Sequence, residues 1–171
     1  MVRNHRMYQR QKNERRPLFD IGTIIQYVVL SAVFALVVFG VNSVVLSAIN
    51  MSPTKQVGNG VLTLYEVHNT GAAFNLFAGQ TDAIIGASFM AIAVIAAIII
   101  FYSARLNQTA ISAMSFLTAG ISMNMLDRLQ HGYVVDYISC NFLPNFPVFN
   151  TADMMIVVGA IGLIFSLLTR N

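Results

Sequence analysis

The chain of 171 residues is 56% hydrophobic and only 10% charged, with a net charge of +3. Soluble domains carry about 25% charged residues, so this composition excludes an ordinary soluble fold, and it also excludes an intrinsically disordered chain. The mean hydropathy of +0.66 predicts an all-α membrane protein, for which this length allows one domain with about four or five spanning helices. The single cysteine, Cys140, cannot form an intrachain disulfide, so the sequence leaves the redox compartment open.

A basic segment, residues 1–20, opens the chain. Six of the ten Lys and Arg residues lie within its first sixteen positions. Such a run could be an arm that binds nucleic acid, but here it directly precedes a long apolar stretch. We therefore interpret residues 1–20 as a cytoplasmic membrane flank and expect no nucleic-acid partner.

Residues 21–171 form a single predicted membrane domain with four transmembrane helices. A span needs about 20 apolar residues, and four charge-free stretches meet that need. The first stretch is too long for a cleavable signal peptide, and three more spans follow it. The predicted spans are residues 21–49, 82–102, 109–126 and 151–168, which leaves residues 50–81 and 127–150 as two loops on the other side of the membrane.

The orientation follows from the positive charges next to the spans, because Lys and Arg concentrate on the cytoplasmic side. Eight basic residues flank the side of the N-terminus, the turn between the second and third spans, and the C-terminus. Only Lys55 and Arg128 fall on the opposite side. Both termini are therefore predicted to be cytoplasmic, with loops 50–81 and 127–150 facing outward.

Two segments depart from the pattern of a plain apolar bundle. The third span, 109–126, is rich in small and hydroxylated residues, which allow close helix packing, so we expect it to be the most buried helix. In the first outward loop, residues 61–67 are rich in β-branched and aromatic types and lie between glycine- and asparagine-containing turns. This pattern predicts a small extracytoplasmic β-element between the first and second helices.

Asp153 is an acid at the edge of an apolar span. Sixteen uncharged residues separate it from Arg170, a helix length of about 24 Å, which is too short for the bilayer core. The fourth helix must therefore include Asp153 and is expected to begin near Asn150. An acid in a first helical turn can serve as a cap that suits the helix dipole, and it can equally be a catalytic group.

Asp136 lies beyond the outer end of the third predicted helix, on the same membrane side as Asp153. Because consecutive antiparallel helices pack about 8–10 Å apart, the two carboxylates are expected at adjacent helix ends. Two nearby carboxylates tend to share one proton, so one can deprotonate water while the other protonates a leaving amine. This pair predicts metal-free peptide hydrolysis, although the spacing alone does not bring the two acids together.

Asn124, Asp127 and Arg128 share one helical face at the outer end of the third span. They are either a solvated helix terminus or polar support for the acid pair. A thiol–imidazole pair from Cys140 is poorly supported by three scattered histidines, and no metal-binding helical motif occurs. We therefore expect no metal and no cofactor.

Four ordered motifs resemble those of the lipoprotein signal peptidase (signal peptidase II) family. They are Asn69-Thr70-Gly71-Ala72-Ala73-Phe74, Asn124-x-x-Asp127-Arg128, Gly132-x-Val134-Val135-Asp136-Tyr137 and Phe146-Pro147-x-Phe149-Asn150-x-Ala152-Asp153. The resemblance covers about residues 20–168. It implies an aspartic endopeptidase in the bacterial cytoplasmic membrane that cleaves prolipoproteins just before a diacylglyceryl-modified cysteine.

The resemblance also assigns roles to individual residues. It implies that Asp136 and Asp153 are the catalytic pair, and that the supporting or substrate-binding residues are Asn69, Gly71, Asn124, Asp127, Arg128 and Asn150. The partners would be diacylglyceryl-modified prolipoproteins and membrane lipids, with the enzyme acting as a monomer.

Two departures from the family pattern stand out. The family usually carries an acid and a lysine on the first helix, whereas residues 41–46 of this chain have neither charge, and the glycine-rich run before Asn124 is reduced to Gly120. The alternatives are a catalytically silent relative that binds lipidated proteins and a transporter subunit whose acids relay protons. Acids at helix ends favour the enzyme over the relay.

Overall fold

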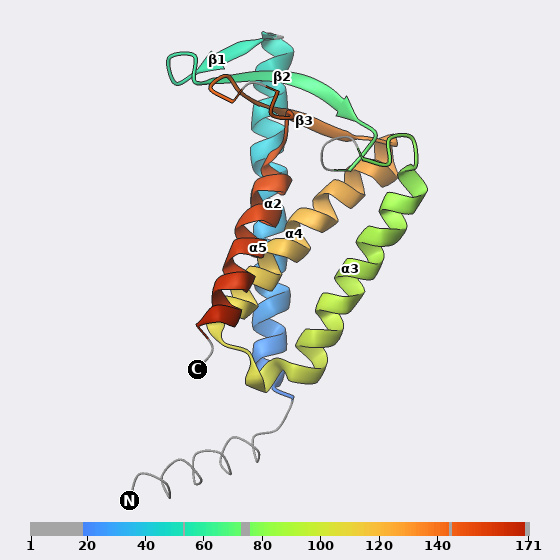
Figure 1. Ribbon diagram of the computed structural model, residues 1–171, viewed down its shortest axis with the longest axis vertical. Coiled ribbons are helices and arrows are strands. Elements are labelled where there is room, and N and C mark those ends of the chain that lie inside the picture. The colour runs from blue at the N-terminus through green and yellow to red at the C-terminus, as the bar shows by residue number, and fades with distance from the viewer. Residues whose placement is uncertain (1–18, 53, 73–75, 144, 170–171) are drawn as a thin grey trace, which may run out of the picture.

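The computed structural model describes residues 19–169 except 53, 73–75 and 144, so most of the basic segment 1–20 lies outside the described residues. Four long helices run through the described part of the chain (Figure 1), and each is long and apolar enough to cross a membrane. They are α2 (Ile21–Met51), α3 (Thr81–Tyr102), α4 (Gln108–His131) and α5 (Thr151–Leu168), with the short 3-10 helix η2 (Ser103–Arg105) between α3 and α4. The predicted four-helix membrane fold is confirmed.

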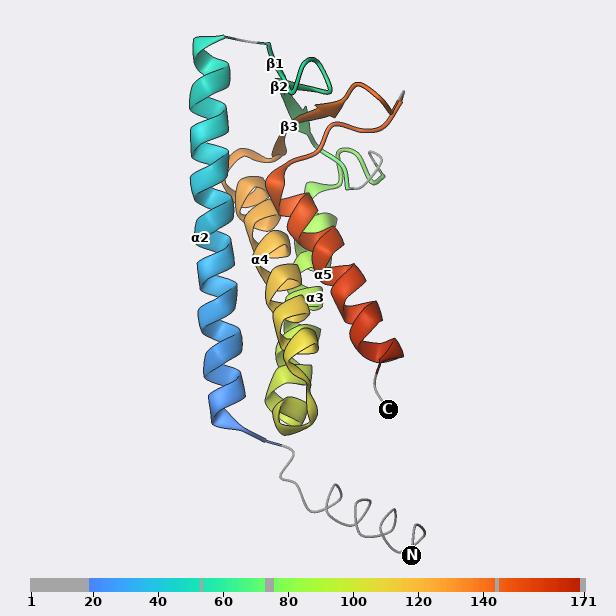
Figure 2. The ribbon, with the colours of Figure 1, turned by 90° about the vertical axis from the view of Figure 1, so that its left-hand side faces the viewer.

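The helices are arranged around α4, which packs against each of the other three. Figures 1 and 2 show α3 and α5 flanking α4, while α2 rises past it to the sheet at one end of the bundle. The most apolar stretch of α4 is 44% buried within the protein, against 17% or less for the other three helices. This confirms the prediction that the third span is the most buried helix.

Glycines allow α4 and α5 to approach each other closely beneath the outer end of the bundle. A Cβ atom on Gly120 of α4 would lie 2.5 Å from the carbonyl oxygen of Ala152, and one on Gly159 of α5 would lie 2.8 Å from that of Ala113. Both distances are shorter than a carbon–oxygen contact permits, so any larger residue would push the helices apart. The first turn of α5, which carries Asp153, is therefore held directly against α4.

The sheet is larger than predicted. Its three antiparallel strands, in the order β1-β2-β3, are β1 (Lys55–Val57), β2 (Leu62–Asn69) and β3 (Val134–Cys140). The predicted β-element between the first two long helices is confirmed as β1 and β2, and β3 from the second loop adds a third strand, which pairs with β2 along Val67↔Asp136 and Asn69↔Val134. Asp136 accordingly lies on a strand and not at a helix end.

Helix α4 also extends further than predicted, to His131 instead of residue 126. The charges at 127 and 128 marked the end of the apolar stretch but not the end of the helix, because protein contacts bury Arg128. The helix ends at Gly132, whose φ of 83° is the left-handed conformation that glycine adopts readily.

Candidate active site

The polar residues singled out by the sequence meet at one end of the bundle, where the sheet lies over the helices. Asn69 ends β2, Asp136 lies on β3, and Asn124 and Arg128 lie on the last turns of α4. The other two, Asn150 and Asp153, lie at the beginning of α5. Residues that are up to 84 positions apart in sequence are thus joined in one hydrogen-bonded cluster.

Asp136 is almost completely enclosed, with 2% of its surface exposed. Its Oδ2 accepts a hydrogen bond from Nδ2 of Asn69 and its Oδ1 accepts one from Nδ2 of Asn150, each at 2.9 Å. Burial, the largest cause, and the nearby charge of Asp153 raise the pKa of Asp136 to about 6, against the opposing effect of the two asparagine hydrogen bonds and Arg128. Asp136 can therefore hold a proton at a pH where an ordinary aspartate has lost it.

Asp153 faces the same cluster from α5. Its Oδ2 accepts from the Asn150 backbone N–H at 3.1 Å, and the Asn150 side chain accepts from the Asp153 N–H at 3.0 Å, which together form a capping box. Its Oδ1 accepts from Nδ2 of Asn124 at 2.7 Å. Asp153 is thus a helix cap, as one interpretation predicted, but its second oxygen is turned toward α4.

Asn150 joins the two acids and is fully buried. Its amide nitrogen donates to Oδ1 of Asp136 at 2.9 Å and to Oδ1 of Asn124 at 3.1 Å, while its amide oxygen accepts from the Asp153 N–H. One side-chain amide has two hydrogens, and both are used here. Asn150 therefore links Asp136 directly to the helical turn that carries Asp153.

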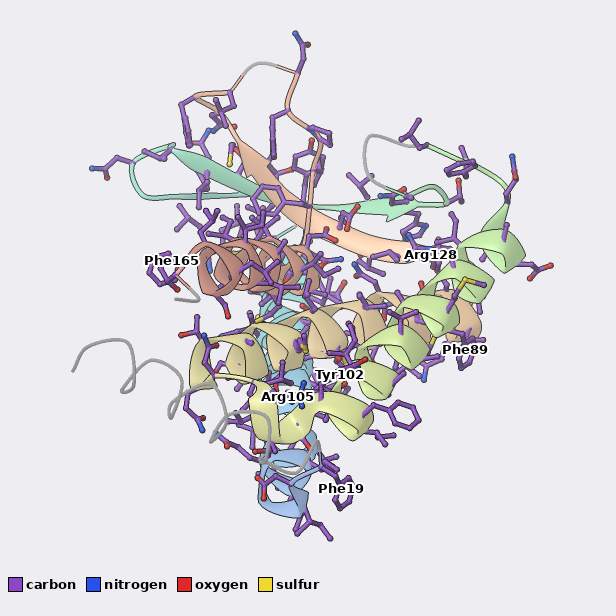
Figure 3. The ribbon with its side chains drawn as sticks, turned by 60° about the horizontal axis from the view of Figure 1, so that its bottom comes forward. Phe19, Phe89, Tyr102, Arg105, Arg128 and Phe165 are labelled. Carbon is purple, nitrogen blue, oxygen red and sulfur yellow. The ribbon has the colours of Figure 1, made fainter. Side chains whose placement is uncertain are left out.

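Arg128 supplies a buried positive charge beside both acids. Figure 3 shows it at the C-terminal end of α4, next to the sheet. Its guanidinium donates to the carbonyl oxygens of Asn124 and Gly71 at 3.1 and 2.5 Å, and Gly71 in turn donates its N–H to the Asn69 side chain. These contacts anchor the loop after β2 and leave Nε of Arg128 with no hydrogen-bond partner among the described residues.

Asp127 lies at the edge of the cluster. Its half-buried carboxylate faces the backbone amide of Val135, the residue before Asp136. Seven of the eight predicted site residues are therefore connected through side-chain hydrogen bonds, whereas Asp127 contacts the strand that carries Asp136. Residues 73 and 74 of the first motif lie outside the described residues.

In the part of the chain that the structure describes, no group of three His, Cys, Asp or Glu residues could hold a metal ion. The chemistry that this cluster can support is acid–base chemistry. It has one buried carboxyl that keeps a proton to about pH 6, a second partly exposed carboxylate, and amide donors that orient both.

Sequence reasoning missed a second polar cluster beside the first. The hydroxyl of Tyr137 contacts Asn42 of α2 and Thr151 of α5, and none of the three had been identified as a site residue. A signal was present, because an asparagine within a long apolar span is costly unless it has a partner.

The chain is similar to several known proteins. The family model described as "Signal peptidase (SPase) II" matches residues 30–169. The lipoprotein signal peptidase of Dehalococcoides mccartyi strain 195 is 34% identical over 129 residues, 72% of this chain and 78% of that protein. The lipoprotein signal peptidase of Lactiplantibacillus plantarum is 32% identical over 145 residues, 83% of this chain and 93% of that protein.

A third relative and a solved structure extend the comparison. The lipoprotein signal peptidase of Enterococcus faecalis is 38% identical over 117 residues, 66% of this chain and 69% of that protein. A bacterial membrane enzyme solved by the in meso method at 2.3 Å resolution superposes with a TM-score of 0.75 at 24% identity, covering 90% of this chain and 92% of that one. At that identity the superposition shows a shared fold.

Proposed function

The chain belongs to the signal peptidase II family, and from this we propose that it is a bacterial membrane protease that removes signal peptides from prolipoproteins, with Asp136 and Asp153 as its catalytic pair. The catalytic assignment rests on the contacts of the Asn150 side chain, which donates a hydrogen bond to Asp136 and accepts one from the backbone N–H of Asp153. Nothing in the comparisons favours the silent relative or the transporter subunit.

We propose the following chemistry for the pair. Asp153, acting as general base, takes a proton from a water molecule, whose oxygen attacks the carbonyl carbon of the scissile peptide bond. Asp136, which keeps its proton to about pH 6, donates to the reacting amide as the C–N bond breaks. The products are a signal peptide with a new carboxylate and a lipoprotein whose modified cysteine has a free amino group.

The surroundings of the pair suit a substrate that is itself in the membrane. The acids lie at the outer end of the bundle, and the outer turns of α5 below them present exposed apolar side chains such as Met154, Val157 and Val158. A signal helix and the acyl chains on the modified cysteine could remain in lipid while the scissile bond reaches the sheet side. We therefore propose diacylglyceryl-modified prolipoproteins as substrates, approached laterally.

We propose a monomer as the active unit, because a single chain supplies both acids and the amides that bond to them. We also propose that both termini are cytoplasmic, because eight of the ten basic residues flank that side. A reporter enzyme that works only in the cytoplasm, fused after Asn171, is expected to be active. Activity from a reporter that works only outside the cytoplasm would contradict this orientation and would place the acids on the wrong side.

The raised pKa of Asp136 predicts a pH dependence. If Asp136 is the proton donor, kcat/KM for cleavage should fall about tenfold per pH unit above about pH 6, because the free enzyme loses the required proton. The folded state also binds this proton more tightly than an unfolded chain, so the free energy of unfolding should decrease as the pH rises from about 4 to about 6. A flat kcat/KM profile between pH 5 and 8 would contradict the role of Asp136 as donor.

The proposed function is tested by incubating the purified protein with a prolipoprotein carrying a diacylglyceryl-cysteine and with the same prolipoprotein unmodified. Cleavage next to the cysteine is scored by gel shift and by the mass of the released lipoprotein. We expect cleavage of the modified form only. Binding of the modified form without cleavage, under several lipid and pH conditions, would favour the silent relative.

A further inference from the structure

The Tyr137 side chain lies beside the acid pair without touching either acid. Tyr137 follows Asp136 on β3, and consecutive side chains on a strand point to opposite faces. Its side chain is nevertheless only 1% exposed, and its hydroxyl reaches Asn42 of α2 and Thr151 of α5. Both Asp136 and Tyr137 are therefore buried, although their side chains leave the strand in opposite directions.

The hydroxyl of Tyr137 has every hydrogen-bonding position filled. It donates to Oδ1 of Asn42 at 2.6 Å. Since a phenol has one hydrogen, the contact with Oγ1 of Thr151 at 2.5 Å must be donated by the threonine, and the backbone N–H of Thr151 donates to the same oxygen at 3.2 Å. One hydroxyl thus connects three elements: α2, β3 and α5.

The attachment on α5 is the turn that carries Asp153. Thr151 is the first residue of α5, where a backbone N–H has no partner within the helix, and the Tyr137 hydroxyl satisfies it. Asn150, on one side of Thr151, contacts Asp136, and Asp153 lies two residues beyond it. The Tyr137 hydroxyl therefore ties the first turn of α5 to the strand that carries Asp136.

We propose that Tyr137, held by Asn42, is a positioning residue that sets the separation of Asp136 and Asp153 for catalysis. The inference rests on the proposed function and deepens it. It also gives a role to Asn42 in the uncharged 41–46 stretch of α2. A displacement of about 1 Å at a reacting group can cost about 10² in rate, so a link of this kind can act without touching substrate.

The backbone makes the test feasible. The N–H groups of Tyr137 and Ile138 both donate to the carbonyl oxygen of Phe149, at 3.0 and 2.8 Å, and Phe149 donates back to Ile138. These bonds keep β3 beside the segment before α5 when the hydroxyl is absent. Tyr137→Phe is therefore expected to fold and to lose only the fine positioning.

The experiment compares Tyr137→Phe, Asn42→Leu and Asn42→Asp with the wild type. Tyr102→Phe, which changes an exposed tyrosine at the far end of α3 (Figure 3), is the matched control. For each protein, kcat and KM for cleavage of the diacylglyceryl-modified prolipoprotein are measured across pH 4.5 to 8. The titration of the Asp136 carboxyl is followed by carbon NMR of aspartate-labelled protein, with the signal assigned through Asp136→Asn.

We expect Tyr137→Phe and Asn42→Leu to lower kcat by about 10- to 100-fold with little change in KM. Their Asp136 carboxyl should titrate at a lower pH than in the wild type, because water enters and the charge of Asp153 moves away. Asn42→Asp keeps an acceptor oxygen for the Tyr137 hydroxyl and should lose less kcat than Asn42→Leu, while Tyr102→Phe should keep the wild-type rate.

Wild-type kcat and an unchanged Asp136 titration in folded Tyr137→Phe would overturn the inference. If Tyr137→Phe does not fold, the contrast between the two Asn42 variants decides, because equal behaviour of Asn42→Leu and Asn42→Asp contradicts the positioning role. If the wild type cleaves nothing, the proposed function fails, and the Asp136 titration in the variants alone decides whether Tyr137 positions this pair.

Discussion

Asp136→Asn and Asp153→Asn are each expected to reduce cleavage of the modified prolipoprotein by about 10²–10⁴-fold, the usual contribution of a general acid or base. An amide nearly preserves the shape of the carboxyl group but neither takes a proton from water nor donates one to a leaving amine. Because the two acids act as a unit, the double variant should be scarcely slower than either single variant. The measurement is kcat/KM for the four proteins at one pH.

Two other aspartates serve as controls for this series. Asp82→Asn changes an exposed acid in the first turn of α3 and should leave cleavage unchanged. Asp127→Asn should reduce cleavage less than the pair variants do, because Asp127 faces the backbone of Val135 and not the acids. Equal losses at Asp127 and Asp136 would contradict the assignment of the pair.

Asn150→Ala is expected to lower both the rate of cleavage and the free energy of unfolding. It removes the amide that joins Asp136 to the turn of Asp153, and it leaves Oδ1 of Asp136 buried without its donor. Loss of an N-cap costs about 0.5–2 kcal/mol, and an unsatisfied buried acceptor adds about 1–3 kcal/mol. Cleavage should fall about 10²-fold, because the two acids are no longer held at a fixed separation.

Asn107→Ala is the matched control for that loss. Asn107 is the N-cap of α4 at the opposite end of the bundle, where its side chain accepts from the N–H of Ala110 at 2.8 Å. Both variants should lower the unfolding temperature, but only Asn150→Ala should lower the cleavage rate per folded molecule. An equal loss of that rate in Asn107→Ala would show that Asn150→Ala acts through lower stability and not through the positioning of the two acids.

Much of the fold could be predicted because the bilayer imposes a strong constraint on sequence. Charge-free stretches of span length located all four helices, and the start of α5 at Thr151 followed from the short distance between Asp153 and Arg170. The small residues of α4 correctly indicated its burial, and Gly120 and Gly159 show where the close approach occurs.

The sheet and the contacts within the site could not be predicted in the same way. β3 contains Val134 and Val135 followed by Asp136, and the acid was interpreted as a helix-end group because a strand is recognised only through its pairing with β2, about 70 residues earlier. The contacts of Asn150, and likewise those of Tyr137, form only where three helices or strands of the fold come together. No local pattern shows that one amide or one hydroxyl will bond to all of its neighbours.

The central claim is that Asp153 acts in catalysis as well as in the capping box of α5, and the activity of Asp153→Asn per folded molecule tests it most directly. The amide oxygen of an asparagine at this position can still accept from the Asn150 N–H. Its amide nitrogen then faces Nδ2 of Asn124, so that two donors meet without an acceptor, at a cost of about 1–3 kcal/mol. Thermal unfolding gives the folded fraction, and cleavage is divided by it. We predict a mostly folded protein that has lost at least about 10² in rate. A destabilised protein whose folded fraction cleaves at the wild-type rate would show that Asp153 is only a cap.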